Sequence, residues 1–211
     1  MDPPDFDALY GGDPDPWQVN TSFYEQRKLG VVLASLTAAR YSLAWDPACG
    51  TGELVTRLAL RCDRVLATDA SVEAVQIARR RCGGWSNVEV TRGVLPSPPP
   101  PAEAEADADA EADAQTEVGA GVEADGPDLV VLAEFLYYLD QTARQQTLEM
   151  ITACAAPAAE VMSLHWRHRA ADAWLSGADM QSEISTTLTG LGWQRTVHHE
   201  EPDFVLDAFR R

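Results

Sequence analysis

Two kinds of hydrophobic pattern alternate along the chain. Short apolar runs typical of buried strands are separated by longer stretches whose apolar residues recur at helical spacing. The runs predict strands at 42–48, 64–69, 87–93, 127–135, 158–166, 193–200 and 203–211. The longer stretches predict helices at 22–37, 52–62, 72–82, 141–155 and 179–191. This alternation indicates one open, mostly parallel α/β sheet with helices on both faces, closed by an antiparallel hairpin. The length suits a single domain, 1–211.

One segment breaks the alternation. Residues 96–126 are rich in alanine and proline and contain nine acidic residues and no basic ones. Acids at every second position place like charges at helical i,i+4 spacing, and the proline run obstructs a helix from the amino-terminal side. We therefore predict a solvated, mostly disordered low-complexity insertion. Removing its nine negative charges would change the formal net charge from -17 to -8.

The excess of acidic residues and the spacing of the cysteines limit the ligands and metals that we expect the protein to bind. A net charge of -17 repels nucleic acids and anionic membrane surfaces, so a neutral or cationic small molecule is the expected substrate. The four cysteines, Cys49, Cys62, Cys82 and Cys154, lack metal-ligand spacing, which predicts free thiols and no metal site. The amino-terminal residues lack the features of a secretory leader, and no apolar run is long enough to cross a bilayer, so we expect a cytoplasmic protein.

A glycine-rich turn, "DPACGTGE" at residues 46–53, links the first predicted strand to a helix. A phosphate-binding loop would need lysine and then serine or threonine after Gly52, where this chain has Glu53 and Leu54. A dinucleotide site would need a third glycine and a helix start free for pyrophosphate, which the Glu53 carboxylate opposes. A nucleoside with a positive sulfonium and no phosphate suits the turn better. The turn therefore predicts S-adenosylmethionine as the cofactor.

Two carboxylates support this prediction. Asp69 ends the second predicted strand, where it could accept hydrogen bonds from both ribose hydroxyls. Asp46 ends the first strand and could face the positively charged amino-acid end of the cofactor. Each residue alone could instead cap a strand or helix, but the combination at this spacing favours cofactor binding.

The motifs resemble a known family. "DPACGTGELVTRLA" with "LATD" is similar to class I S-adenosylmethionine-dependent methyltransferases. "DPDPWQVNTSFYEQRK", "DLVVLAEFLYYL", "HWRH" and "HHEEPDFVLDAFRR" narrow the resemblance to the nodulation protein S group of N-methyltransferases. The resemblance implies a Rossmann-like, seven-stranded, mostly parallel sheet with a reversed C-terminal strand. It also implies methyl transfer to the amine of an amino sugar or oligosaccharide, by a monomer or homodimer.

Strand ends and the glycine turn predict most of the site residues, and the resemblance adds those of the lid. Glu134 and His165, at the ends of the fourth and fifth strands, are the catalytic candidates facing the acceptor, with Glu134 either a base or an orienting group. Residues 1–40 form a lid region, in which Arg27, or Lys28 in its place, meets the cofactor's carboxylate. Tyr137 and Tyr138 pack against the ligand or in the core. The predicted cofactor-binding residues are Trp17, Tyr24, Arg27, Asp46, Ala48, Cys49, Gly50, Gly52, Asp69, Ala70, Val94 and Glu134.

One residue departs from the family pattern. Family members often carry an acidic residue after a glycine following the third strand, where it accepts from the adenine amino group, whereas this chain has Gly93-Val94. Either backbone groups and apolar packing hold adenine, or the affinity for the cofactor is weaker. Two alternatives stay open: an O-methyltransferase of a small natural product, since the framework does not separate nitrogen from oxygen acceptors, and a non-catalytic cofactor-binding module.

Overall fold

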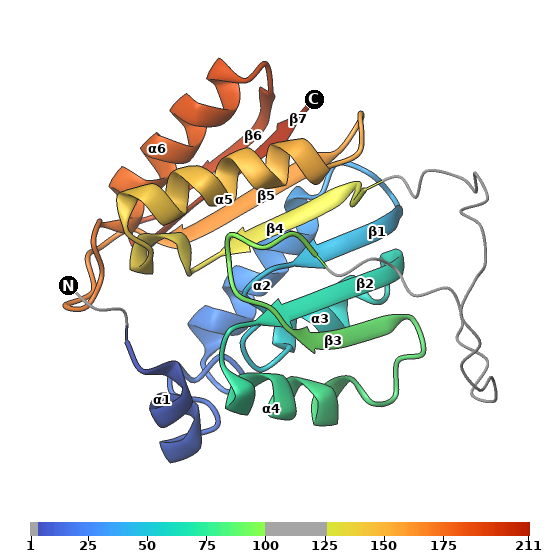
Figure 1. The fold of residues 1–211 in the computed structure, drawn as a ribbon, viewed down its shortest axis with the longest axis vertical. Helices are drawn as coiled ribbons and strands as arrows, with labels where there is room; N and C mark the ends of the chain where they lie inside the picture. The colour runs from blue at the N-terminus through green and yellow to red at the C-terminus, as the bar shows by residue number, and fades with distance from the viewer. Residues whose placement is uncertain (1–3, 100–125) are drawn as a thin grey trace, which may run out of the picture.

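One sheet organises the protein, and its strands follow the order β3-β2-β1-β4-β5-β7-β6 (Figure 1). The computed structural model describes residues 4–99 and 126–211, so most of the predicted insertion lies outside the described residues. The strands are β1 (Tyr41–Asp46), β2 (Cys62–Asp69), β3 (Val88–Arg92), β4 (Leu129–Ala133), β5 (Glu160–Trp166), β6 (Gln194–Glu200) and β7 (Phe204–Arg210). All pairs are parallel except those of β7, which runs antiparallel to both β5 and β6. The predicted mostly parallel sheet with a reversed last strand is thus confirmed.

Helices cover both faces of the sheet (Figure 1). They are α1 (Phe6–Gly12), α2 (Phe23–Ser35), α3 (Glu53–Leu58), α4 (Val72–Cys82), α5 (Gln141–Cys154) and α6 (Gly177–Gly190), with one 3-10 turn, η1 (Leu136–Tyr138). Helices α2, α3 and α4 bury apolar residues in the core on one face, whereas α5 and α6 pack into a second core on the other. In the described part of the chain, no helix combines the length and apolar character that a bilayer span requires.

The central strands are apolar on both faces because they separate these two cores. On β1, Ala44 points into one core and its neighbour Trp45 into the other. Val65 and Leu66 of β2 divide in the same way. Successive side chains of a strand point to opposite faces, so a strand covered on both faces reads as a continuous apolar run.

The strand order creates a crevice at the carboxyl ends of β1 and β4. From β1 the chain continues to β2 and β3 on one side, whereas β4, β5 and the hairpin lie on the other. In open α/β sheets, the loops at such a reversal diverge to opposite faces and leave room for a ligand. The glycine turn after β1 and the segment after β4 both begin at this point.

Two elements differ from the sequence prediction. Helix α3 ends at Leu58 rather than continuing to residue 62, because Leu60 and Arg61 form tight turn hydrogen bonds and Cys62 already pairs with Tyr41 in the sheet. Helix α1 was not predicted as a separate helix. It is capped by the Asp5 side chain, which accepts from Ala8 N, but it has no fully buried residue, so its sequence lacks an amphipathic pattern.

Candidate active site at the carboxyl ends of the strands

The glycines of the turn after β1 are required by its backbone and its neighbours. Gly50 and Gly52 have φ angles of +52° and +80°, in the left-handed region that side chains rarely adopt. A Cβ on Gly52 would lie 3.2 Å from Cys82 Sγ of α4. A Cβ on Gly50 would lie 2.9 Å from the hydroxyl of Tyr10 in α1. The turn is therefore shaped both to start α3 against α4 and to let another group approach it closely.

Asp69 holds this turn in place. Its Oδ2 accepts from Gly50 N at 2.8 Å and its Oδ1 accepts from Ser71 N at 2.9 Å. Burial raises the pKa of Asp69, while the two backbone amides oppose that rise. Ser71 in turn caps α4 by accepting from Ala74 N, and its hydroxyl donates to Asp7 of α1 at 2.6 Å. One carboxylate thus joins the turn to α4, and Ser71 extends the link to α1.

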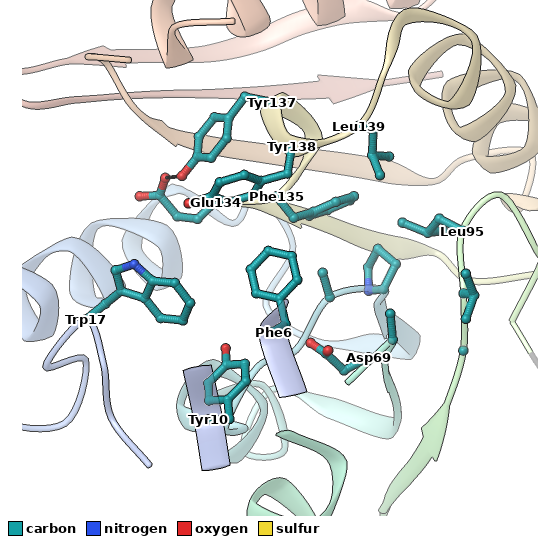
Figure 2. A pocket seen from close by; sticks show the side chains of 15 residues that line it. Phe6, Tyr10, Trp17, Asp69, Leu95, Glu134, Phe135, Tyr137, Tyr138 and Leu139 are labelled. Atoms are coloured by element: carbon teal, nitrogen blue, oxygen red, sulfur yellow. Dashed lines mark hydrogen bonds between the residues drawn. The ribbon is translucent and has the colours of Figure 1, made fainter. Parts of the chain in front are cut away.

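The crevice contains two adjoining cavities. The first, here called the aromatic chamber, has a volume of about 190 Å³ and is partly open to solvent. Its walls come from α1 and from the residues after β1, β2, β3 and β4. Figure 2 shows the rings of Phe6, Tyr10, Trp17, Phe135 and Tyr138 around it, with Asp69 at its floor. A mostly apolar cavity with a few polar groups is typical of a small-molecule site.

The second cavity, here called the charged chamber, lies beside the first and shares Tyr10, Trp17, Ala48 and Glu134 with it. The carboxyl side chains that line it are Asp15, Glu25, Asp46, Glu53 and Glu134. Lys28 is the one lysine or arginine among the residues that form its walls. The two chambers therefore offer an apolar space and an acidic space at the same turn.

Glu134 lies between the chambers and accepts three hydrogen bonds. Its backbone is in the left-handed region, with a φ of +62°, which is rare for a residue with a side chain and is often found at functional sites. One carboxylate oxygen accepts from Lys28 Nζ at 2.6 Å. The other accepts from the Tyr137 hydroxyl at 2.8 Å and from Trp166 N at 2.7 Å (Figure 2 shows the Tyr137 bond). Burial favours a higher pKa, but the Lys28 ammonium and His165 outweigh it and the pKa of Glu134 is lowered. Glu134 is thus a fixed anion, which suits an orienting group better than a base.

Lys28 is buried between two carboxylates. It is 4 % exposed, and its ammonium lies 2.9 Å from Glu25 and 2.6 Å from Glu134. Burial lowers the pKa of a lysine, but the two glutamates outweigh that effect and raise the pKa of Lys28. The ring of Tyr24 lies beneath it, with Nζ 5.1 Å from the ring centroid. Lys28 is therefore charged, and Tyr24 supports it without lining either chamber.

Arg27 does not reach the site. It forms a forked ion pair with Glu201, with N to O distances of 2.6 and 2.7 Å, at the protein surface. Successive helical residues point in directions about 100° apart, so only one of the two basic neighbours can face the crevice. The prediction that Arg27 meets the cofactor is wrong in this structure. Its alternative, Lys28, occupies the chamber wall.

His165 is the second residue that the structure places elsewhere. The preceding residue, Leu164, lines the charged chamber, so the side chain of His165 points to the opposite face of β5, toward α6. Its Nδ1 bonds Gln181 Oε1 at 3.0 Å, and Gln181 Nε2 donates to Asp207 at 2.8 Å, which makes Nδ1 the protonated nitrogen. Burial lowers the pKa of His165. The prediction that His165 faces the crevice is wrong. Tyr137 lines the aromatic chamber instead, and its ring centroid lies 5.4 Å from that of the His165 imidazole.

The Glu53 carboxylate is paired with two arginines, which its sequence position does not reveal. Its carboxylate forms ion pairs with Arg57 at 3.4 Å and with Arg81 of α4. Arg81 also donates to the carbonyl of Thr51 in the glycine turn at 2.7 Å. Glu53 therefore fixes the turn to α4 in addition to lining the charged chamber.

All the remaining predicted residues except Gly52 line one of the two chambers. Trp17, Ala48, Asp69, Ala70, Val94 and Glu134 line the aromatic chamber, and Asp46, Cys49 and Gly50 line the charged one. Gly52 shapes the turn without lining either, and all four cysteines are free. Sequence reasoning missed Phe6 and Tyr10, since α1 gave no periodic signal, and it missed the apolar wall formed by Leu95 and Leu139. Within residues 4–99 and 126–211, no cluster of three or more His, Cys, Asp or Glu side chains could hold a metal ion.

Comparisons with known proteins agree with this architecture. The family model of nodulation protein S matches residues 12–94. Nodulation protein S of Bradyrhizobium diazoefficiens is 31% identical over 75 residues, which are 35% of this chain and 36% of that protein. This match spans about a third of the curated relative. The residues matched by the family model include the glycine turn and Asp69.

Solved structures extend the similarity to nearly the whole chain. A candidate methyltransferase from Pseudomonas syringae is 28% identical and covers 90% of this chain and 100% of its own, with a TM-score of 0.68. The N-methyltransferase NodS from Bradyrhizobium japonicum WM9, in complex with S-adenosyl-L-homocysteine, is 21% identical and covers 94% and 93%, also with a TM-score of 0.68. The chain has the class I methyltransferase fold. Its resemblance to nodulation protein S, predicted from the motifs, is confirmed.

The acid pair of this methyltransferase fold gives a pH-dependent prediction. Burial raises the pKa of Asp46 from its ordinary value of 3.8 to about 7, and the Asp69 carboxylate adds to the rise. Between about pH 4 and pH 7 the folded chain keeps a proton that the unfolded chain has lost, so this group makes the protein less stable as pH rises through that window. Asp46→Asn carries no charge at any pH. We expect its melting temperature relative to the wild type to rise with pH through that window, by at least about 3 °C between pH 5 and pH 8.

The control for this prediction is Asp63→Asn, which removes an exposed carboxylate on the same strand as Asp69. Its melting temperature relative to the wild type should not rise with pH. A difference between Asp46→Asn and the wild type that is the same at pH 5 and pH 8 would contradict the raised pKa.

Proposed function

We propose that the protein transfers a methyl group from S-adenosylmethionine to a small-molecule acceptor, namely the amine of an amino sugar or oligosaccharide. The observation that carries the cofactor assignment is the Asp69 carboxylate, which fixes the glycine turn and also lines the aromatic chamber. A carboxylate at the tip of the second strand provides strong acceptors for ribose hydroxyls. The similarity to NodS, whose crystal structure contains S-adenosyl-L-homocysteine, supports the assignment.

The two chambers fit the two ends of such a cofactor. The aromatic chamber suits a nucleoside, since its rings and apolar side chains can pack on a base while Asp69 meets the sugar. The charged chamber has more carboxyl groups than cations, which favours a ligand end bearing an ammonium and a sulfonium. Lys28 is the residue that would meet the carboxylate of that end.

The chain's own contribution to the reaction is alignment and exclusion of water. The sulfonium of the cofactor supplies an activated methyl group for direct displacement by a nucleophile. Phe6, Tyr10 and Trp17 cover the crevice from the amino-terminal side and reduce the access of water to it. Glu134, held by Lys28 and Tyr137, orients groups at the junction of the chambers. An amine must reach this junction in its neutral form to act as a nucleophile.

A methyl-transfer assay tests the acceptor. The protein is incubated with S-adenosylmethionine carrying a labelled methyl group and with an oligosaccharide of glucosamine, and the same sugar with its amine acetylated serves as the control. We expect label on the free amine only, at a rate that rises about tenfold per pH unit below the amine's pKa. Transfer to the acetylated sugar would contradict an amine acceptor.

A second candidate is an O-methyltransferase of a small natural product. The observation that favours it is the wall formed by Phe135, Tyr138 and Leu139, which suits a flat apolar acceptor at least as well as a sugar. The same assay with a phenolic acceptor separates the candidates, because only the O-methyltransferase would label the phenol. Cofactor binding without transfer to any acceptor would favour a non-catalytic module.

A further inference from the structure

The loop after β3 forms an apolar end wall of the aromatic chamber. Gly93 N donates to the carbonyl of Asp69 at 3.0 Å, which joins the start of the loop to the tip of β2. A Cβ on Gly93 would lie 2.9 Å from Thr68, so the loop packs directly on the end of this strand. The next two side chains, Val94 and Leu95, face the chamber. Figure 2 shows Leu95 at the end of the chamber opposite Trp17, beyond Asp69.

Among the described residues, no carboxylate belongs to this wall. In the described part of the chain, the carboxylates that line the aromatic chamber are Asp69 and Glu134. Asp69, held by two backbone amides, is the residue that meets the ribose in the proposed function, and Glu134, held by Lys28, Tyr137 and a backbone amide, lies where the two chambers join. At the wall itself, the side chains of Ala70, Val94 and Leu95 offer only hydrocarbon.

Because the wall is hydrocarbon, it determines which chemical groups of a bound nucleoside affect the affinity. The argument rests on the proposed function: if the ribose meets Asp69, the base extends toward Val94 and Leu95. A site that pairs a polar group rejects ligands lacking that group by about 10⁴-fold or more, whereas an apolar wall discriminates far less. Val94 is also 53 % exposed, and with Leu95 it borders a second open depression on the surface. A substituent on the outer edge of the base would therefore meet solvent rather than packed atoms.

We infer that the site does not read the 6-position of the purine, and that Val94 is the residue responsible. Nucleoside cofactors that lack the exocyclic amine, or that carry a small alkyl group on it, bind as well as the adenosine form. A chain with a carboxylate at this position would accept a hydrogen bond from the amine and would select adenine.

Calorimetric titration of three ligands into the full-length protein tests the inference. The ligands are S-adenosylhomocysteine, its analogue without the 6-amino group, and its N6-methyl analogue. For the wild type, we expect the three dissociation constants to agree within about threefold. A loss of about tenfold or more for either analogue would overturn the inference while leaving the cofactor assignment intact. If none of the three bound, the proposed function itself would fail, and the inference with it.

A substitution assigns the effect to Val94. Val94→Asp places a carboxylate at the wall, and we expect it to favour S-adenosylhomocysteine over the analogue without the amine by about tenfold, as a charge-assisted hydrogen bond would. The matched control is Leu60→Asp, which adds the same charge at a 65 % exposed position in the turn before β2. The control should keep the wild-type ratio of affinities. An unchanged ratio in Val94→Asp would overturn the assignment to this residue.

Discussion

Replacing Asp69 by asparagine is expected to weaken binding of S-adenosylhomocysteine by about a hundredfold or more. The carboxylate accepts from Gly50 N with one oxygen and from Ser71 N with the other. Asparagine has the same shape, but its amide nitrogen would point a donor at one of these two donors. The turn and the start of α4 would lose their common partner, and a ribose would lose its anionic acceptor. Calorimetric titration of the variant measures the loss.

The control for this experiment is Asp63→Asn. Asp63 is on the same strand, and its carboxylate forms an exposed ion pair with Arg40. Its replacement should leave the affinity for S-adenosylhomocysteine within about twofold, since exposed pairs contribute little. If Asp69→Asn folded normally and bound the ligand as tightly as the wild type, Asp69 would not be part of the cofactor site.

Replacing Lys28 by methionine is expected to lower the free energy of unfolding by about 3–5 kcal/mol, as removal of one partner from a buried ion pair does. The change leaves Glu25 and Glu134 close together in the buried wall without their cation. The pKa of Glu134 would then rise, because burial would no longer be opposed by the ammonium. The variant should accordingly recover stability as pH falls and the carboxylates take up protons. Urea unfolding at pH 8 and at pH 5 measures both effects.

The adjacent residue supplies a matched control. Arg27→Met also removes a cation from α2, but Arg27 pairs with Glu201 at the surface. It should change the urea midpoint little, because solvent screens an exposed pair. Equal losses in the two variants would show that Lys28 is not a buried cation between Glu25 and Glu134. A loss in Lys28→Met that did not diminish toward pH 5 would show that unpaired carboxylates are not its cause.

The backbone of the site could be predicted from the sequence because local chemistry dictates it. Two glycines between a strand and a helix require a sharp turn, and Gly50 and Gly52 have the positive φ angles that only glycine adopts readily. A carboxylate at the tip of the neighbouring parallel strand must lie beside that turn, as Asp69 does. Neither feature depends on distant packing.

Side-chain direction was less predictable. His165 and Leu164 are consecutive on a strand that is apolar on both faces, so hydrophobic pattern does not reveal which of them points into the crevice. For Arg27 and Lys28, the sequence did contain a signal for which of them points inward. Lys28 lies one helical turn before Val32, which is fully buried, so these two share a face. Helix α1 has no such pattern, because it lines the aromatic chamber rather than a core.

Titration of the wild-type protein tests most directly the central claim, which is that the crevice binds S-adenosylmethionine. S-adenosylhomocysteine is titrated into the unmodified protein, with NADH as a control ligand of similar nucleoside chemistry that carries a pyrophosphate. The account predicts saturable one-to-one binding of S-adenosylhomocysteine and no heat of binding for NADH, because the turn offers acidic side chains where a pyrophosphate would need donors. Binding of NADH, or no binding of S-adenosylhomocysteine, would contradict it.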